Sequence, residues 1–245
     1  MSPAPPGVRV VLLDIEGTTT PIAFVHDRLF TFARAHLDRY LSEHWATPAV
    51  RDAISRLTSE RAADREAADL PPWHDTTPAE LRASLGAYAR WLMDRDRKSP
   101  GLKLLQGVIW DEGYQAGELH GEVFDDVPRA LERWRRDSLE IAIYSSGSEL
   151  AQRLLFSSTQ HGDLTALISG FFDTAVGAKT AADSYRRIGR ILKRQPSEMI
   201  FVSDLTAELT AAGDAGCETR LCVRPGNPQQ PGADRFDQIR SLDDI

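Results

Sequence analysis

The sequence predicts an α/β fold, a doubly wound and mostly parallel sheet with an inserted all-helical cap. Short apolar segments alternate with helix-like segments over residues 122–245, which is typical of βαβ units whose parallel sheet is covered on both faces. One further strand-like segment, "VRVVLLD", lies far upstream at residues 8–14. Residues 21–121 carry only long helical patterns. We therefore expect an α/β core formed by residues 1–20 and 122–245, and a helical cap domain at 21–121.

In chain order, the first predicted strand is followed by the helical module. Its patterns are "DRLFTFARAHLDRYLSEHW", "PAVRDAISRLTSERAADREAAD" and "PAELRASLGAYARWLMDRDR", and no β-branched run interrupts them. Proline-containing segments such as "LPPWHDTTP" separate the patterns, because proline ends helices.

The second half of the chain begins with a predicted helix, "DVPRALERWRRDS". Asp126 is placed to cap its N-terminus, and Pro128 lies in its first turn. Predicted strands and helices then alternate, and Gly216 closes the last helix. The strands are "LEIAIYSSGS", "FFDTAVGA", "MIFVSD" and "TRLCV"; the helices are "SELAQRLLFSST", "TAADSYRRIGRILKR" and "TAELTAAGDAG".

Composition and charge exclude several classes of protein. The 245 residues are 42% hydrophobic and 27% charged, as in an ordinary globular protein of one or two domains. A net charge of −7 argues against a nucleic-acid partner, and no apolar run is long enough for a membrane span. Residues 1–10 form a short leader without the features of a signal peptide, so we expect a cytoplasmic protein. We also expect a monomer.

Cysteine and histidine usage argues against transition-metal chemistry. Cys217 and Cys222 provide neither a disulfide framework nor a zinc ligand set, and they fit small buried residues in a reducing compartment. The six histidines form no H-x-H or HExxH pattern.

Reactive polar groups stand at the ends of four predicted strands. Taken singly, each has an ordinary explanation, such as a helix N-cap or a solvated lysine. Parallel strands bring their carboxyl ends to one edge of the sheet, where open α/β proteins bind ligands, so together these groups predict a site. They are Asp14 with Glu16, Ser145 with Ser146, Lys179, and Asp204.

The chemistry that suits this set is phosphoryl transfer. Clustered carboxylates repel one another unless a cation lies among them, and oxygen-only ligands suit Mg²⁺. Asp14 can act as a nucleophile and form an aspartyl-phosphate. Gly17 indicates that the chain has left the strand, so Glu16 can return over the site and serve as general acid and base. Lys179 and the serine hydroxyls would neutralise and hold the phosphate.

Four motifs, in this order, resemble the haloacid-dehalogenase superfamily of aspartyl-phosphate hydrolases: "LLDIEGT", "YSSGS", Lys179 and "FVSDLTAE". Most members carry Asp at the second acidic position, where this chain has Glu16. "DIEGTTTPI", "YSSGS" and "VRPGN" further resemble a narrower family, the acireductone synthases, which are the enolase-phosphatases of methionine salvage. The chain departs from that family at Ala178, because "GAK" stands where "GHK" is expected.

The resemblance implies a role for each residue and one Mg²⁺ per subunit. Asp204 is the remaining protein ligand of the metal. Glu208 has three readings: it orients the metal's waters, pairs with Lys179, or is an ordinary surface residue of a helix. The other implied roles are nucleophile and Mg²⁺ ligand for Asp14, Mg²⁺ binding by the backbone carbonyl and acid–base work by the side chain for Glu16, phosphate binding for Ser145 and Ser146, and substrate binding for Lys179.

The implied reaction is the conversion of 2,3-diketo-5-methylthiopentyl-1-phosphate, a small phosphate ester, to acireductone and phosphate. A phosphatase for another small ester is a second reading of the same chemistry. A receiver-type signalling module is a third, but it has no use for the long helical insertion, and its phosphate-accepting Asp ends a later strand. Dehalogenation needs no Mg²⁺ and is disfavoured. The helical module would cover the site, with Trp73, His74 and Trp110 as either substrate contacts or packing residues.

Overall fold

The computed structural model of the protein describes residues 5–245, so the first four residues of the expected leader lie outside the described part. The chain divides into two compact units. One is Met1–His26 with His120–Ile245, which we call the α/β unit, and the other is Asp27–Leu119, the helical unit. The sequence placed the corresponding boundaries at 20/21 and 121/122.

The α/β unit contains a six-stranded sheet in the order β3-β2-β1-β4-β5-β6, and every neighbouring pair is parallel. The predicted α/β fold class is confirmed. Both neighbours of β1 end one residue beyond it, because Leu13 pairs with Ile143 of β2 and with Val202 of β4. The strands are β1 (Val10–Leu13), β2 (Glu140–Tyr144), β3 (Gly170–Phe172), β4 (Met199–Ser203), β5 (Glu218–Cys222) and β6 (Gln238–Ile239).

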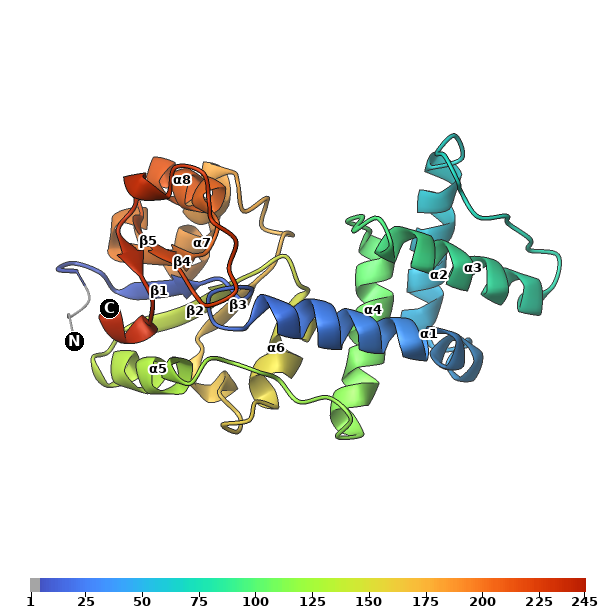
Figure 1. Ribbon diagram of the computed structural model, residues 1–245, viewed down its shortest axis with the longest axis horizontal. Coiled ribbons are helices and arrows are strands. Elements are labelled where there is room, and N and C mark those ends of the chain that lie inside the picture. The colour runs from blue at the N-terminus through green and yellow to red at the C-terminus, as the bar shows by residue number, and fades with distance from the viewer. Residues whose placement is uncertain (1–4) are drawn as a thin grey trace. The chain divides into compact units, whose positions relative to one another are not determined.

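Helices cover both faces of this sheet (Figure 1). All four residues of β1 are fully buried, as expected for a central parallel strand. On one side lie α5 (Asp126–Arg136) and α6 (Glu149–Ser157), and on the other α7 (Ala182–Leu192) and α8 (Thr206–Ala215). Short 3₁₀ turns complete the unit: η2 (Thr165–Leu167), η3 (Pro196–Glu198), η4 (Ala233–Arg235) and η5 (Leu242–Asp244).

The start of α5 corrects one expectation. Its N-cap is Asp125 rather than Asp126, and the Asp125 side chain makes no capping hydrogen bond. The Asp126 carboxylate instead accepts hydrogen bonds from Leu242 N at 2.6 Å and from Ser241 Oγ at 2.9 Å. The Asp126 side chain therefore binds donors from distant parts of the chain and a buried arginine, described below, instead of capping its own helix.

The helical unit contains α1 to α4. Proline occupies the first position of α2, α3 and α4, where its missing N–H is not needed. Thr77 and Glu80 form a reciprocal capping box at the start of α3. The helices are α1 (Thr31–Glu43), α2 (Pro48–Ala63), α3 (Pro78–Met93) and α4 (Pro100–Gln115), preceded by the π-helical η1 (Phe24–Phe30). Within the described residues, no helix combines the length and apolar character that crossing a membrane requires.

Candidate active site

Asp14 follows β1, the strand with a neighbour on each side, and its side chain is buried. The Oδ1 atom accepts a hydrogen bond from Lys179 Nζ at 2.5 Å and another from Ile15 N at 2.7 Å. The Oδ2 atom lies 3.2 Å from Ser203 Oγ, which is at the end of the adjacent β4. Two donors on Oδ1, with the serine hydroxyl beside Oδ2, thus fix the orientation of one carboxylate at the sheet edge.

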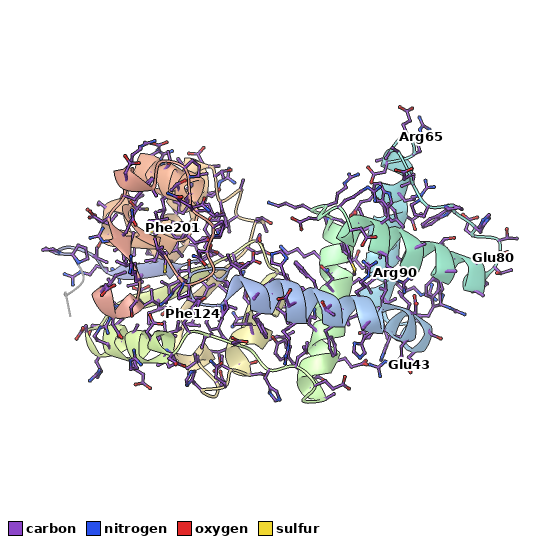
Figure 2. The ribbon with its side chains drawn as sticks, in the orientation of Figure 1. Glu43, Arg65, Glu80, Arg90, Phe124 and Phe201 are labelled. Carbon is purple, nitrogen blue, oxygen red and sulfur yellow. The ribbon has the colours of Figure 1, made fainter. Side chains whose placement is uncertain are left out.

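Lys179 reaches this carboxylate through the interior. Its Nζ lies 5.9 Å from the ring centroids of Tyr144 and Phe201, the second of which is labelled in Figure 2. Its backbone carbonyl accepts a hydrogen bond from Tyr185 Oη at 2.7 Å. Burial by itself lowers the pKa of Lys179, but the carboxylates of Asp14 and Glu208 outweigh this and raise the pKa above its ordinary value. The ammonium therefore stays charged.

Glu208 lies in the first turn of α8 and is the second partner of Lys179. Its Oε2 atom is 2.7 Å from Lys179 Nζ and 2.9 Å from Ser203 Oγ. The side chain is buried, so the surface-helix reading is wrong and pairing with Lys179 is what the structure shows. Burial and then the charge of Asp14 raise the pKa of Glu208 to about 7.

Asp204 stands directly after β4, and only 5% of its surface is exposed. No donor in the described part of the chain forms a hydrogen bond with its carboxylate. Burial raises the pKa of Asp204 to about 7, and the charges of Asp14 and Glu208 add to this shift. A largely buried carboxylate without a protein donor is costly to ionise, so a cation, a proton or water is its natural partner.

Gly17 sits in the turn that follows Asp14, with φ at +66°, in the left-handed region. A Cβ atom at this position would lie 2.6 Å from Asp204 Oδ2. Only glycine therefore allows the turn to approach Asp204 this closely. Glu16 precedes Gly17 in the same turn, its side chain is 38% exposed, and its Oε1 atom lies 3.7 Å from His26 Nε2.

Ser145 and Ser146 follow β2, so they stand at the same sheet edge as Asp14. Ser145 is buried, and its Oγ accepts a hydrogen bond from Gly147 N at 3.2 Å, whereas Ser146 is exposed. Among the described residues, neither serine hydroxyl is hydrogen-bonded to Asp14 or Lys179.

The structure thus brings Asp14, Lys179 and Asp204 together, and it adds a residue that the sequence analysis missed. Ser203 bridges Asp14 and Glu208; the only signal was a small polar residue just before Asp204 at the end of an apolar strand. We call Asp14, Lys179, Ser203, Asp204 and Glu208 the Lys179 cluster.

The oxygen-only donor set of the Lys179 cluster fits a hard divalent cation. Three buried carboxylates face a single ammonium, and the carboxylate of Asp204 accepts no hydrogen bond within the described residues. The site would therefore carry surplus negative charge if all its acids were ionised. A cation coordinated by Asp14 and Asp204 removes that surplus.

A second acidic group lies in the helical unit, where ligand atoms of Glu43, His44 and Glu112 are within 4.8 Å of one another. Glu112 is already paired there, with Arg39 Nη2 at 2.9 Å and His44 Nε2 at 2.7 Å. Arg39 supplies the positive charge that an ion would supply, so the negative charge of this acidic group is already largely compensated.

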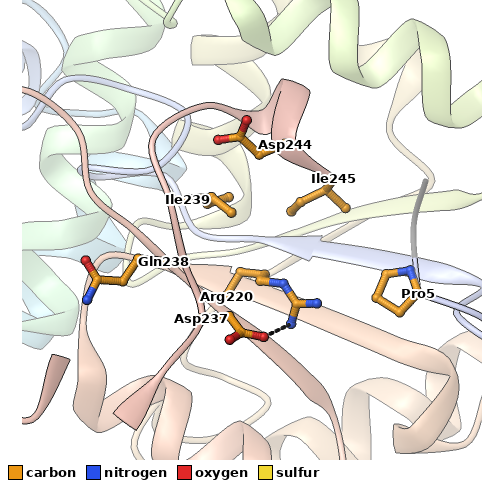
Figure 3. A pocket seen from close by; sticks show the side chains of 7 residues that line it. All are labelled: Pro5, Arg220, Asp237, Gln238, Ile239, Asp244 and Ile245. Carbon is orange, nitrogen blue, oxygen red and sulfur yellow. Dashed lines mark ion pairs between the residues drawn. The ribbon is translucent and has the colours of Figure 1, made fainter. Parts of the chain in front are cut away.

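A pocket of about 360 Å³ lies at β5 and β6 (Figure 3). Its charged lining residues are Arg220, Asp237 and Asp244, and Asp237 Oδ2 lies 3.6 Å from Arg220 Nη1. No member of the Lys179 cluster lines this pocket. Its lining residues are Pro5, Arg220, Asp237, Gln238, Ile239, Asp244 and Ile245.

The chain, with its parallel sheet and a buried Asp–Lys pair at the carboxyl edge, belongs to a known class of hydrolase. Residues 8–216 match the family of haloacid dehalogenase-like hydrolases. The resemblance inferred from the four motifs is therefore confirmed.

Similar proteins narrow the assignment from the superfamily to one family within it. The chain is 45% identical to enolase-phosphatase E1 of Synechococcus elongatus, over 99% of this chain and all of that protein. It is 44% identical to a probable bifunctional methylthioribulose-1-phosphate dehydratase/enolase-phosphatase E1 of Vitis vinifera, of which it spans 47%. The crystal structure of the UTR4 protein of Saccharomyces cerevisiae has a TM-score of 0.77 and 31% identity, covering 97% of this chain and 100% of that one. The chain belongs to the enolase-phosphatase E1 family of haloacid dehalogenase-like hydrolases and is a phosphatase.

Proposed function

We propose that the protein is the Mg²⁺-dependent enolase-phosphatase of methionine salvage. It would convert 2,3-diketo-5-methylthiopentyl-1-phosphate to acireductone and inorganic phosphate through an aspartyl-phosphate. The observation that carries the proposal is the fixed Asp14 carboxylate, held by Lys179 at 2.5 Å beside the carboxylate of Asp204, which accepts no hydrogen bond from the described residues. The full-length similarity to enolase-phosphatases supports the choice of substrate.

In the phosphatase half-reaction, an Asp14 carboxylate oxygen attacks phosphorus as the bond to the ester oxygen breaks. Lys179 and Ile15 N donate to Oδ1 and Ser203 Oγ lies 3.2 Å from Oδ2, so the carboxylate is held in one orientation for this attack. Glu16 gives its proton to the leaving oxygen. It then takes a proton from the water that attacks phosphorus and releases phosphate, which regenerates Asp14. Ser145, Ser146 and Lys179 neutralise and hold the phosphate oxygens.

One Mg²⁺ per subunit would be held by the carboxylates of Asp14 and Asp204 and by the backbone carbonyl of Glu16. When bound, the ion neutralises phosphate charge and polarises substrate oxygens. Lys179 holds Asp14 in place whether or not the ion is bound, because its ammonium lies 2.5 Å from that carboxylate.

Both half-reactions, the enolisation of the diketone and the release of phosphate, would use this one site. The other acidic group found among the described residues, around Glu112, is already paired with Arg39. The helical unit would act as a cap that selects the substrate. Trp110 is not free for this role, because its ring is buried and its Nε1 donates to Leu29 O at 2.7 Å. Trp73, which stacks with Arg61, and His74 remain candidates.

The cellular setting is part of the proposal. Cys217 and Cys222 are buried free thiols, which suits a cytoplasmic protein. We also propose a monomer, which light scattering after gel filtration tests directly.

The decisive experiment supplies the diketo phosphate with Mg²⁺ and follows phosphate release together with acireductone absorbance. Both should rise together in the native protein and stop after chelation. Phosphate release from other esters, with no acireductone formed from the diketo phosphate, would assign the protein to another phosphatase substrate.

A further inference from the structure

The loop after β5 contains a tight turn, Arg224-Pro225-Gly226-Asn227. Asn227 N donates to Arg224 O at 3.1 Å, and Gly226 has φ at +90°. Proline at the second position and a left-handed glycine at the third define a type II turn. The turn brings the side chains of its first and last residues close together.

Those two side chains hold successive carbonyls of the turn that follows Asp14. Asn227 Nδ2 donates to Gly17 O at 2.9 Å, and Arg224 Nε donates to Thr18 O at 3.1 Å. β5 is not a neighbour of β1, because β4 lies between them. The contacts therefore cross the end of β4 at the sheet edge where Asp204 stands.

Arg224 is itself rigidly held. Its guanidinium is buried, pairs with Asp126 Oδ2 at 2.9 Å and lies 4.4 Å from the ring centroid of Phe124. Its Nη1 atom also donates to Arg240 O at 3.0 Å. We call Arg224, Asp126 and the groups that they bind the Arg224 cluster. It anchors one end of the type II turn to the body of the α/β unit.

Asn227 completes the contact with the site. A Cβ atom on Gly17 would lie 2.6 Å from Asp204 Oδ2 and 2.9 Å from Asn227 Nδ2, so Gly17 lies against both side chains. Glycine has two accessible halves of conformational space. Because Asp14 and Thr18 O are both held, a rotation at Gly17 must be taken up in the backbone of residues 15 and 16, which would move the Glu16 side chain relative to Asp14. The hydrogen bond from Asn227 to Gly17 O opposes that rotation.

We propose that Asn227 is a positioning residue that keeps Glu16 in reach of the leaving oxygen, with Arg224 as its anchor. Asn227 acts through the Gly17 turn and contacts no reacting atom. The inference rests on the proposed acid–base role of Glu16. It adds to the site a residue from the loop after β5, a strand that does not border β1.

A double-mutant cycle tests this, with Asn227→Ala and Glu16→Gln made singly and together. Loss of positioning should lower kcat about 10- to 100-fold in the parent and leave KM within about threefold. In the Glu16→Gln background, the same change should cost less than about threefold, because the group it positions is already disabled. Equal losses in the two backgrounds, or an unchanged kcat in the parent, would overturn the proposal.

Two further variants control for folding and shape. Asn227→Asp keeps the side-chain shape but removes the donated N–H, so it should lose at least as much kcat as the alanine; wild-type kcat would contradict the role of the hydrogen bond. Gln229→Ala changes an exposed residue of the same loop and should leave kcat and the unfolding midpoint unaltered.

The cycle is measured on ethyl phosphate, whose alkoxide leaving group needs a proton, as well as on the diketo phosphate. A parent enzyme that hydrolyses only ethyl phosphate sinks the proposed substrate, while the cycle on ethyl phosphate still decides the role of Asn227. The two failures are therefore distinguishable.

Discussion

The α/β unit buries two groups of charges, and they differ in balance. In the Arg224 cluster, one guanidinium meets one carboxylate at 2.9 Å. The same carboxylate oxygen of Asp126 also accepts hydrogen bonds from Leu242 N and Ser241 Oγ. The two charges there balance one to one, as buried ion pairs require, although Arg224 Nη2 has no hydrogen-bond partner among the described residues.

In the Lys179 cluster, by contrast, the buried negative groups outnumber the positive ones. Its single ammonium serves two carboxylates, at 2.5 Å and 2.7 Å, and a third carboxylate, that of Asp204, accepts no hydrogen bond from the described residues. Burial and mutual repulsion raise the pKa of Asp204 and of Glu208 to about 7. A balanced buried pair is structural, whereas a surplus of buried charge of one sign indicates a ligand of the opposite sign.

The largest expected effect is at the centre of the unbalanced cluster. Asp14→Asn keeps the side-chain shape but cannot form an acyl phosphate, so phosphate release should fall at least about 10⁴-fold, or roughly 5 kcal/mol of barrier. Release is measured at saturating substrate and Mg²⁺, with circular dichroism to check the fold. Appreciable residual turnover would replace attack by Asp14 with direct attack by water.

The balanced cluster should respond in stability. Asp126→Asn leaves the buried guanidinium of Arg224 without a counter-charge, and breaking a buried pair in this way costs about 3–5 kcal/mol. Urea unfolding followed by tryptophan fluorescence measures the loss. A change below about 1 kcal/mol would show that the carbonyl contacts of Arg224 suffice, and would weaken the comparison between the clusters.

The sequence predicts the parts of this fold that hydrophobicity determines. The apolar runs of β1, β2 and β4 are recognisable because both faces of these strands are buried. β6 consists only of Gln238–Ile239, which carries no apolar run, so its pairing with β5 depends on tertiary structure. The N-cap expected at Asp126 failed for the same reason, because the groups that bind it lie more than a hundred residues away.

The candidate site shows the same division. Parallel topology requires the ends of β1 and β4 to meet, so grouping Asp14 with Asp204 needs only the strand assignment. The contacts of Ser203 and Asn227 cannot be obtained that way, because serine and asparagine occur in ordinary turns and strand ends everywhere. Only the three-dimensional path of the loops shows that one bridges two acids and the other holds Gly17.

A moderate effect on stability is expected when Asp204→Asn removes one negative charge of the Lys179 cluster from metal-free protein. The pKa of Asp204 is raised to about 7 from 3.8, so between about pH 4 and 7 the folded state holds a proton that the unfolded chain has released. Stability therefore falls as pH rises through this window. Asp204→Asn should flatten the fall and leave the metal-free variant about 1–2 kcal/mol more stable than the parent at pH 8.

Thermal unfolding in chelator, from pH 4 to 8, measures this difference, and a parallel series with Mg²⁺ sharpens it. The parent should gain stability on Mg²⁺ addition, whereas Asp204→Asn should gain much less because a ligand charge is lost. Identical pH profiles without metal would contradict the surplus of charge in the Lys179 cluster.

The smallest effect is expected at an exposed pair in the helical unit. Arg34 Nη1 lies 2.6 Å from Asp94 Oδ1, closer than the 2.9 Å of the buried Arg224 pair, but the two side chains are 45% and 54% exposed. Water already solvates both charges, so Asp94→Asn should change the free energy of unfolding by less than about 1 kcal/mol. Asp94 also follows the last turn of α3, where a negative charge opposes the helix dipole, so its removal offsets part of that loss.

Urea unfolding in low salt and in 1 M NaCl measures the change, which should vanish at high salt because the Debye length is then only about 3 Å. A loss as large as that of Asp126→Asn would mean that distance, rather than burial and balance, sets the strength of ion pairs in this protein.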